Sequence, residues 1–66
     1  MDKNNPYDLL VGGTWQDVFT NLGDAQTAAL PHIEAGLDVS IETSGEQMPK
    51  HVWTYDRVEN RWVKLT

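Results

Sequence analysis

The sequence contains no cysteine, so neither a disulfide nor a thiolate-bound metal can stabilise the fold. No apolar run approaches the roughly 20 residues that a membrane-spanning helix needs, and residues 1–6 lack the apolar core of a secretory signal. We therefore expect a soluble, intracellular protein with no membrane partner. Its 66 residues allow one small domain, 1–66, with a flexible N-terminus over 1–5. A core this small needs many aromatic side chains, a partner, or both.

Basic residues are absent from Asn4 to Gln47. Residues 1–49 contain eight carboxylates and one lysine, whereas residues 50–66 contain four basic and two acidic side chains. Because Lys and Arg supply most of the affinity for phosphate backbones, direct nucleic-acid binding is disfavoured. The charge pattern indicates a solvated acidic face, contact with a basic partner, or self-association in which the acidic half of one copy meets the basic half of another.

The first half of the sequence has helical signals. Asn5 as an N-cap, with Pro6 at the first helical position, predicts one or two helical turns over 7–11, which Gly12-Gly13 would end. A longer helix is predicted from Thr14, because the apolar residues that follow it recur at i, i+3, i+4 and i+7. These residues are Trp15, Val18, Phe19 and Leu22.

Gly23 is placed to end that helix in a left-handed conformation. Asp24 would then cap a second helical stretch over 25–30, which Pro31 interrupts before at most one further turn over 32–35. A helix, a glycine turn, a helix and a basic hairpin also suggest a winged helix-turn-helix. Its second helix would carry no Lys or Arg, which disfavours DNA binding.

Beyond Gly36 the period changes to two, and the alternation of apolar and polar residues over 37–42 predicts a strand. Two β-rich runs, 51–56 and 61–65, predict a hairpin. With a three-residue loop that ends at a left-handed Asn60, Tyr55 pairs with Val63 and Trp53 with Leu65. Trp62 then points to the opposite face.

The sequence therefore predicts an α+β domain with two or three short N-terminal helices packed on a three-stranded antiparallel sheet. An all-β alternative makes 15–19 a strand. The residues expected in the core are Trp15, Val18, Phe19, Leu22, Leu30, Ile33, Leu37, Val39, Ile41, Trp53, Tyr55, Val63 and Leu65.

Motifs for chemistry are sparse. His32 and Glu34 could offer a metal two ligands, but no third ligand stands nearby. Ser40 lies on the solvent face of the predicted strand with Asp38, without the glycine-flanked elbow of a serine hydrolase. Gly12-Gly13 lacks the lysine and the longer glycine pattern of a phosphate loop. We expect no catalytic, cofactor or metal site, and no enzymatic activity, because so short a chain rarely encloses a substrate pocket.

Trp62 is the strongest candidate for contact with a partner, because Trp, Tyr and Arg are enriched in binding hot spots. Arg61, Lys64 and Val52 would complete one patch with it. In the alternative interpretation, the N-terminal segment covers Trp62 with Tyr7 or Leu9. A second set of candidates for partner binding is acidic and comprises Asp17, Asp24 and Glu34.

Residues 51–66, with Trp53-Thr54-Tyr55-Asp56 and Asn60-Arg61-Trp62, resemble the outer hairpin of a kelch repeat. Because a propeller needs several blades of roughly 50 residues, this likeness implies a shared hairpin only. Residues 14–18, Ala35-Gly36, the alternating strand and the closing hairpin resemble small accessory proteins of tailed-phage virions.

The phage resemblance implies a non-enzymatic protein–protein interaction module that docks on a larger assembly. It also implies a location in the host cytoplasm or, as an alternative, incorporation in a virion. Short acidic chains without cysteine are also similar to phage-encoded inhibitors of host proteins. The alternative function is therefore a small acidic inhibitor that binds a host enzyme or nucleic-acid-binding protein and masks its basic surface.

Overall fold

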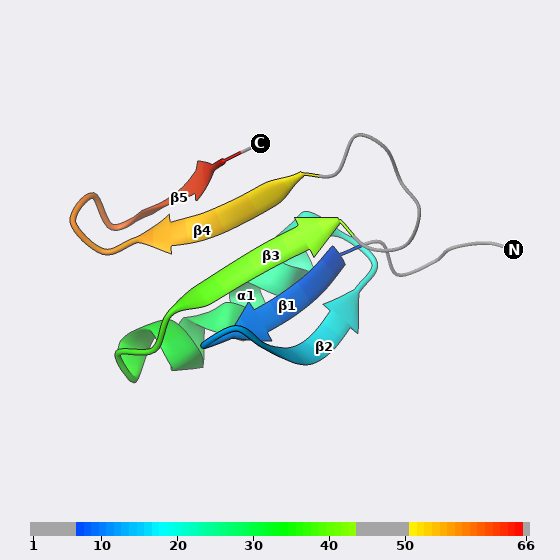
Figure 1. Ribbon diagram of the computed structural model, residues 1–66, viewed down its shortest axis with the longest axis horizontal. Helices are drawn as coiled ribbons and strands as arrows, with labels where there is room; N and C mark the ends of the chain where they lie inside the picture. Colours follow the sequence, from blue (N-terminus) through cyan, green and yellow to red (C-terminus); the bar gives the residue numbers. More distant parts are fainter. Residues whose placement is uncertain (1–6, 44–50, 66) are drawn as a thin grey trace, which may run out of the picture.

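The computed structural model describes residues 7–43 and 51–65, which form one antiparallel sheet and one helix (Figure 1). The N-cap predicted at Asn5 and the flexible N-terminus predicted over 1–5 lie outside the described residues. In chain order, the elements are β1 (Tyr7–Val11), β2 (Thr14–Phe19), α1 (Leu22–Glu34), β3 (Val39–Thr43), β4 (Val52–Asp56) and β5 (Arg61–Lys64). The prediction of two or three helices on a three-stranded sheet was wrong: the described chain has one helix and five strands in the order β2-β1-β3-β4-β5.

The first two strands form a hairpin where two helices were predicted. Gly12 and Gly13 both have positive φ, 61° and 84°, which suits the two-residue turn that matches the twist of paired strands. The pairing then shifts between Leu9 and Leu10, so that Trp15 pairs with Leu10 and Val18 with Asp8. This bulge places Trp15 and Val18, three residues apart, on one face of the sheet. The bulged strand therefore accounts for the three-residue spacing of Trp15 and Val18, whereas Phe19 points to the other face and Leu22 begins α1. The all-β alternative placed a strand over 15–19, where β2 lies, but it did not include the helix that the described chain contains.

Helix α1 begins one turn earlier than predicted and continues through Pro31. Its N-cap is Asn21, whose side chain accepts a hydrogen bond from the backbone N–H of Asp24 at 2.8 Å. Gly23 lies inside the first turn and does not end a helix. At the other end Gly36, with φ 86°, adopts the left-handed conformation, and the N–H of Leu37 donates to the carbonyl of His32 at 3.0 Å.

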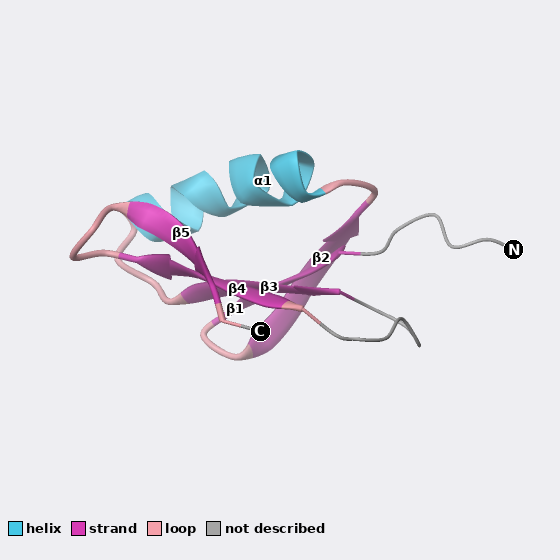
Figure 2. Cartoon of the chain, turned by 90° about the horizontal axis from the view of Figure 1, so that it is seen from above, coloured by secondary structure: helices cyan, strands magenta, loops and turns pink. Residues whose placement is uncertain are grey.

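The core lies between α1 and the three strands β2, β1 and β3, which α1 contacts (Figure 2). Its buried apolar side chains are Leu9, Val11, Ala25, Ala29, Ile33, Val39 and Ile41. The predictions for Ile33, Val39 and Ile41 are confirmed. Those for six other residues were wrong. The exposed fractions are 56% for Trp15, 47% for Leu30, 45% for Leu37 and 58% for Leu65, and the strand pairing places Val18 and Val63 on the side of the sheet opposite α1.

The β4–β5 hairpin is confirmed, but its predicted register was wrong by one residue. Asn60 has the expected left-handed φ of 56°, yet the loop contains four residues, 57–60, because Asp56 pairs with Arg61. Tyr55 therefore pairs with Trp62, and Trp53 with Lys64. As side chains alternate along a strand, this shift moves Trp62 to the side of the sheet that carries α1.

Candidate functional site

One face of the sheet carries α1, and no other described element covers the opposite face (Figure 2). Directly paired residues point to the same side of a sheet, so the register assigns each side chain to a face. We call the side opposite α1 the bare face. Its strand side chains, with Leu65 next to β5, are Asp8, Leu10, Trp15, Val18, Ser40, Glu42, Val52, Thr54, Asp56, Arg61, Val63 and Leu65.

An apolar group at the β1–β2 end of the bare face is formed by Trp15, Leu10 and Val18. Trp15 is 56% exposed, and its indole Nε1 donates a hydrogen bond to the carboxylate of Asp8 at 3.3 Å. The indole is thereby tied to the neighbouring strand although most of the ring surface is open to solvent. An oriented, exposed tryptophan is a typical anchor of a protein interface.

A second apolar group lies at the β4–β5 end of the bare face and comprises Val52, Val63 and Leu65. The backbone N–H of Leu65 donates to the carbonyl of Val52 at 2.7 Å, which extends the hairpin by one residue beyond β5. Leu65 is 58% exposed. The two apolar groups therefore flank the bare face at both edges of the sheet.

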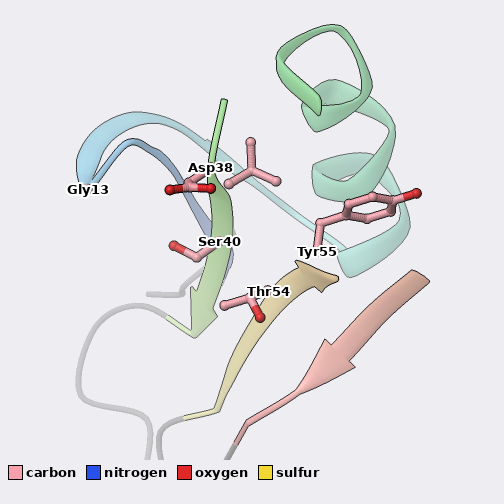
Figure 3. Close-up of a pocket in the computed structure, with 6 residues that line it drawn as sticks. Gly13, Asp38, Ser40, Thr54 and Tyr55 are labelled. Atoms are coloured by element: carbon pink, nitrogen blue, oxygen red, sulfur yellow. The ribbon is translucent and has the colours of Figure 1, made fainter. Parts of the chain in front are cut away.

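Between them runs a polar strip on β1, β3 and β4. It contains the carboxylates of Asp8, Glu42 and Asp56 and the hydroxyls of Ser40 and Thr54. Asp38, immediately before β3, points to the same side as Ser40 (Figure 3). Among the described residues of this face, four carboxylates thus stand against the single guanidinium of Arg61. Such a strip attracts cationic groups and repels phosphates.

The strip includes a hollow where β3 and β4 part. These strands are paired over only three residue pairs, the last being Ser40 with Thr54, so the end of β4 continues past the paired region. An open hollow of about 400 Å³ lies there, and we call it the notch (Figure 3). The residues that line it are Gly13, Asp38, Val39, Ser40, Thr54 and Tyr55. In Figure 3 the Asp38, Ser40 and Thr54 side chains point to one side, whereas the Tyr55 ring points toward the helix.

On the other side of the sheet, β4 and β5 carry aromatic side chains beside α1. The rings of Tyr55 and Trp62 meet edge to face at 5.6 Å between centroids, and Tyr7 contacts Trp53 at 5.8 Å. All four are partly buried and pack against the core. These aromatic residues therefore extend the core beyond the area that α1 covers.

Arg57, in the β4–β5 loop, joins this hairpin to the end of α1. Its guanidinium donates to the carbonyl of Ile33 at 2.9 Å and also to the carbonyl of Leu37. The Ile33 carbonyl lies in the last turn of α1 and also accepts from the backbone N–H of Gly36 at 3.0 Å. A cation at this end of the helix interacts favourably with the helix dipole. Arg57 is thus a structural residue, a role that its position in a polar loop did not indicate.

The predicted contact patch is divided between the two faces. Trp62 and Lys64 lie on the α1 side, where Trp62 packs against the core and the Lys64 ammonium stands 6.0 Å from the Trp53 ring centroid. Val52 and Arg61 lie on the bare face. The outward orientation predicted for Trp62 was therefore wrong, and Tyr55, not Tyr7 or Leu9, makes the ring contact with it. A role of these four residues in partner binding stays a prediction.

The three acidic candidates are not gathered in one place. Asp17 is on β2, where its carboxylate accepts a hydrogen bond from the N–H of Val18 at 2.8 Å. Asp24 lies in the first turn of α1, and Glu34 is its last residue. The more coherent acidic surface is the strip on the bare face. Its signal in the sequence was the alternation that places Asp38, Ser40 and Glu42 on one side of a strand.

In residues 7–43 and 51–65, no group of three or more His, Asp or Glu side chains could hold a metal ion. Within the same ranges, no helix has the length and apolar character needed to cross a membrane. Gly12-Gly13, considered as an anion site before a helix, instead connects two strands.

Comparison of the chain with protein-family models, curated proteins and solved structures finds no match. The resemblances to tailed-phage accessory proteins and to a kelch hairpin therefore stay predictions.

Proposed function

We propose that this protein is a non-enzymatic binding module that docks on a protein partner through the bare face of its sheet. The observation that supports this proposal is the presence of six apolar side chains on a face that no described element covers. In a two-layer domain the uncovered face of an antiparallel sheet normally alternates to polar residues. Two apolar groups there, each with a residue more than half exposed, are typical of an interface.

The arrangement also specifies the partner surface. An apolar group stands at each edge, and the strip between them is acidic, so the complementary surface has a basic centre between two apolar contacts. Trp15 is the proposed anchor, since it combines a large exposed ring with a fixed orientation through Asp8. The carboxylates of the strip would speed the encounter and select the partner by charge.

Site-specific photo-crosslinking tests this proposal. A benzoylphenylalanine would replace either Leu65 on the bare face or Leu30 on α1, two leucines with similar exposed fractions of 58% and 47%. In extracts of the native source, we expect a discrete crosslinked adduct from position 65 and none from position 30. The reverse pattern would place the interface on the helix side and contradict the proposal.

The acidic strip favours a second candidate function, that of an inhibitor that covers a basic nucleic-acid-binding groove. In this case the partner surface would be the one that normally binds phosphates. Competition distinguishes the two: duplex DNA would displace the protein from its partner if it is an inhibitor of this kind. If it is a docking module, DNA would not compete beyond the effect of matched ionic strength.

A further inference from the structure

Among the described residues, four carboxylates lie on the bare face, and they differ in how they are used within the chain. Asp8 accepts from the Trp15 indole. Asp56 accepts from the N–H groups of Val58 and Glu59 at 2.9 and 3.2 Å, which holds the β4–β5 loop. Glu42 likewise makes a polar or electrostatic contact within the protein. The Asp38 carboxylate has no hydrogen bond or ion pair to the described part of the chain, and it stands at the notch.

The notch combines this carboxylate with two hydroxyls at defined positions. Ser40 and Thr54 are directly paired, which places their Cβ atoms about 5 Å apart. Asp38 is two residues before Ser40 on the same side, a separation of roughly 7 Å along the strand. Figure 3 shows all three side chains directed toward the same side. The notch thus offers hydrogen-bond acceptors from both strands that border it: Asp38 and Ser40 from β3 and the segment before it, and Thr54 from β4.

We propose that the notch receives an arginine side chain of the protein partner, with Asp38 as its counter-ion and the Ser40 and Thr54 hydroxyls as further acceptors. This inference rests on the proposed function and names the contact at its centre. A guanidinium has five N–H donors in a planar fork, so it can bond to acceptors spread over several ångströms. A lysine ammonium concentrates its three donors at one point and would reach fewer of them.

The test uses the full-length protein labelled with ¹⁵N and a small probe, N-acetyl-arginine-N-methylamide. The matched probe is the citrulline analogue, which has nearly the same shape without the charge, and a lysine analogue provides the ammonium. We expect the arginine probe to shift the amide signals of Gly13, Ser40 and Thr54, with saturation within about 100 mM for a single exposed contact. The citrulline probe should leave these signals in place.

Asp38→Asn should lower the affinity for the arginine probe about tenfold, which is the contribution of one charge-assisted hydrogen bond. Glu34→Gln changes the net charge by the same amount at the end of α1 and should leave the affinity unchanged. If Asp38→Asn alters the whole spectrum, the double variant Ser40→Ala/Thr54→Ala decides, with an expected loss of a few-fold. Equal shifts with citrulline, equal binding of lysine, or no effect of either variant would overturn the proposal.

These measurements are independent of the crosslinking test. A negative titration together with an adduct from position 65 would remove the arginine contact and leave docking through the bare face intact. A positive titration together with an adduct only from position 30 would contradict the proposed function while the notch would remain a guanidinium site.

Discussion

The indole of Trp15 donates a hydrogen bond across the first hairpin to the carboxylate of Asp8, with 3.3 Å between Nε1 and Oδ1. The ring is more than half exposed, so this bond orients an aromatic surface that the fold itself does not use. An indole held in one orientation loses less side-chain entropy when a partner binds. This relationship is the basis for treating Trp15 as the anchor of the bare face.

The orientation of Trp15 can be measured without a partner. Protein labelled with 5-fluorotryptophan contains three probes, and Trp15→Phe assigns one ¹⁹F signal. We expect the Trp15 signal to show the largest shift between H₂O and D₂O, and Asp8→Ala to move and sharpen it as the indole gains freedom. Asp8→Asn keeps an acceptor and should have a smaller effect. A Trp15 signal insensitive to solvent would mean that the ring is covered.

The altered register of the second hairpin predicts that Trp62 supports the fold. Trp62→Ala removes the edge-to-face contact with Tyr55 and the packing against the core, which should lower the free energy of unfolding by about 2 kcal/mol. Val58→Ala, at a position 89% exposed, should change it by less than about 0.5 kcal/mol. Urea denaturation monitored by circular dichroism measures both. Equal unfolding free energies for the two variants would show that the Trp62 side chain does not support the fold and is exposed on the surface.

Arg57 should be the basic residue on which folding depends most. Arg57→Ala leaves the carbonyls of Ile33 and Leu37 without this donor, at an expected loss of about 1–2 kcal/mol in unfolding free energy. Arg57→Lys should recover only part of this free energy, because one ammonium does not reproduce the planar, forked donors of a guanidinium. Arg61→Ala is the matched control on the same hairpin, where we expect a change below about 0.5 kcal/mol. Equal losses of unfolding free energy for Arg57→Ala and Arg61→Ala would exclude a structural role of the Arg57 guanidinium at the end of α1.

Substitution by alanine should change the stability of the protein in opposite directions at two glycines. Gly13 has φ 84°, so Gly13→Ala strains the turn and should destabilise the protein by about 1 kcal/mol. Gly23 lies in α1, where an added Cβ meets only the Asn21 side chain at 3.5 Å, an ordinary contact. Gly23→Ala should therefore raise the stability by about 0.5–1 kcal/mol. A destabilised Gly23→Ala would indicate that residue 23 ends a helix, as the sequence had predicted.

The sequence predicted the strands well where alternation was regular. Val39 and Ile41 are buried as the period of two indicated, and Asn60 has the left-handed conformation expected for the hairpin loop. The loop length, however, could not be read from the sequence, because loops of three and four residues both accommodate a left-handed Asn60. That difference of one residue determined the face of Trp62.

The N-terminal half was misread for a physical reason. A bulge in β2 gives Trp15 and Val18 the three-residue spacing of a helix while both remain on one face of a sheet. Gly12-Gly13 was a hairpin signal of greater weight than that spacing, because both glycines adopt positive φ. The bare face could not be predicted either, since it depends on the assignment of these strands.

The most direct test of the account is quantitative capture of the partner by three forms of the immobilised protein: wild type, Trp15→Ser and Leu30→Ser. Both substitutions remove a large exposed apolar side chain, one from the bare face and one from α1. Mass spectrometry of the bound fraction should show a protein that wild type and Leu30→Ser retain and that Trp15→Ser loses by at least about tenfold, as for an interface hot spot. Retention by Trp15→Ser with loss by Leu30→Ser, or no protein lost by Trp15→Ser, would contradict docking through the bare face.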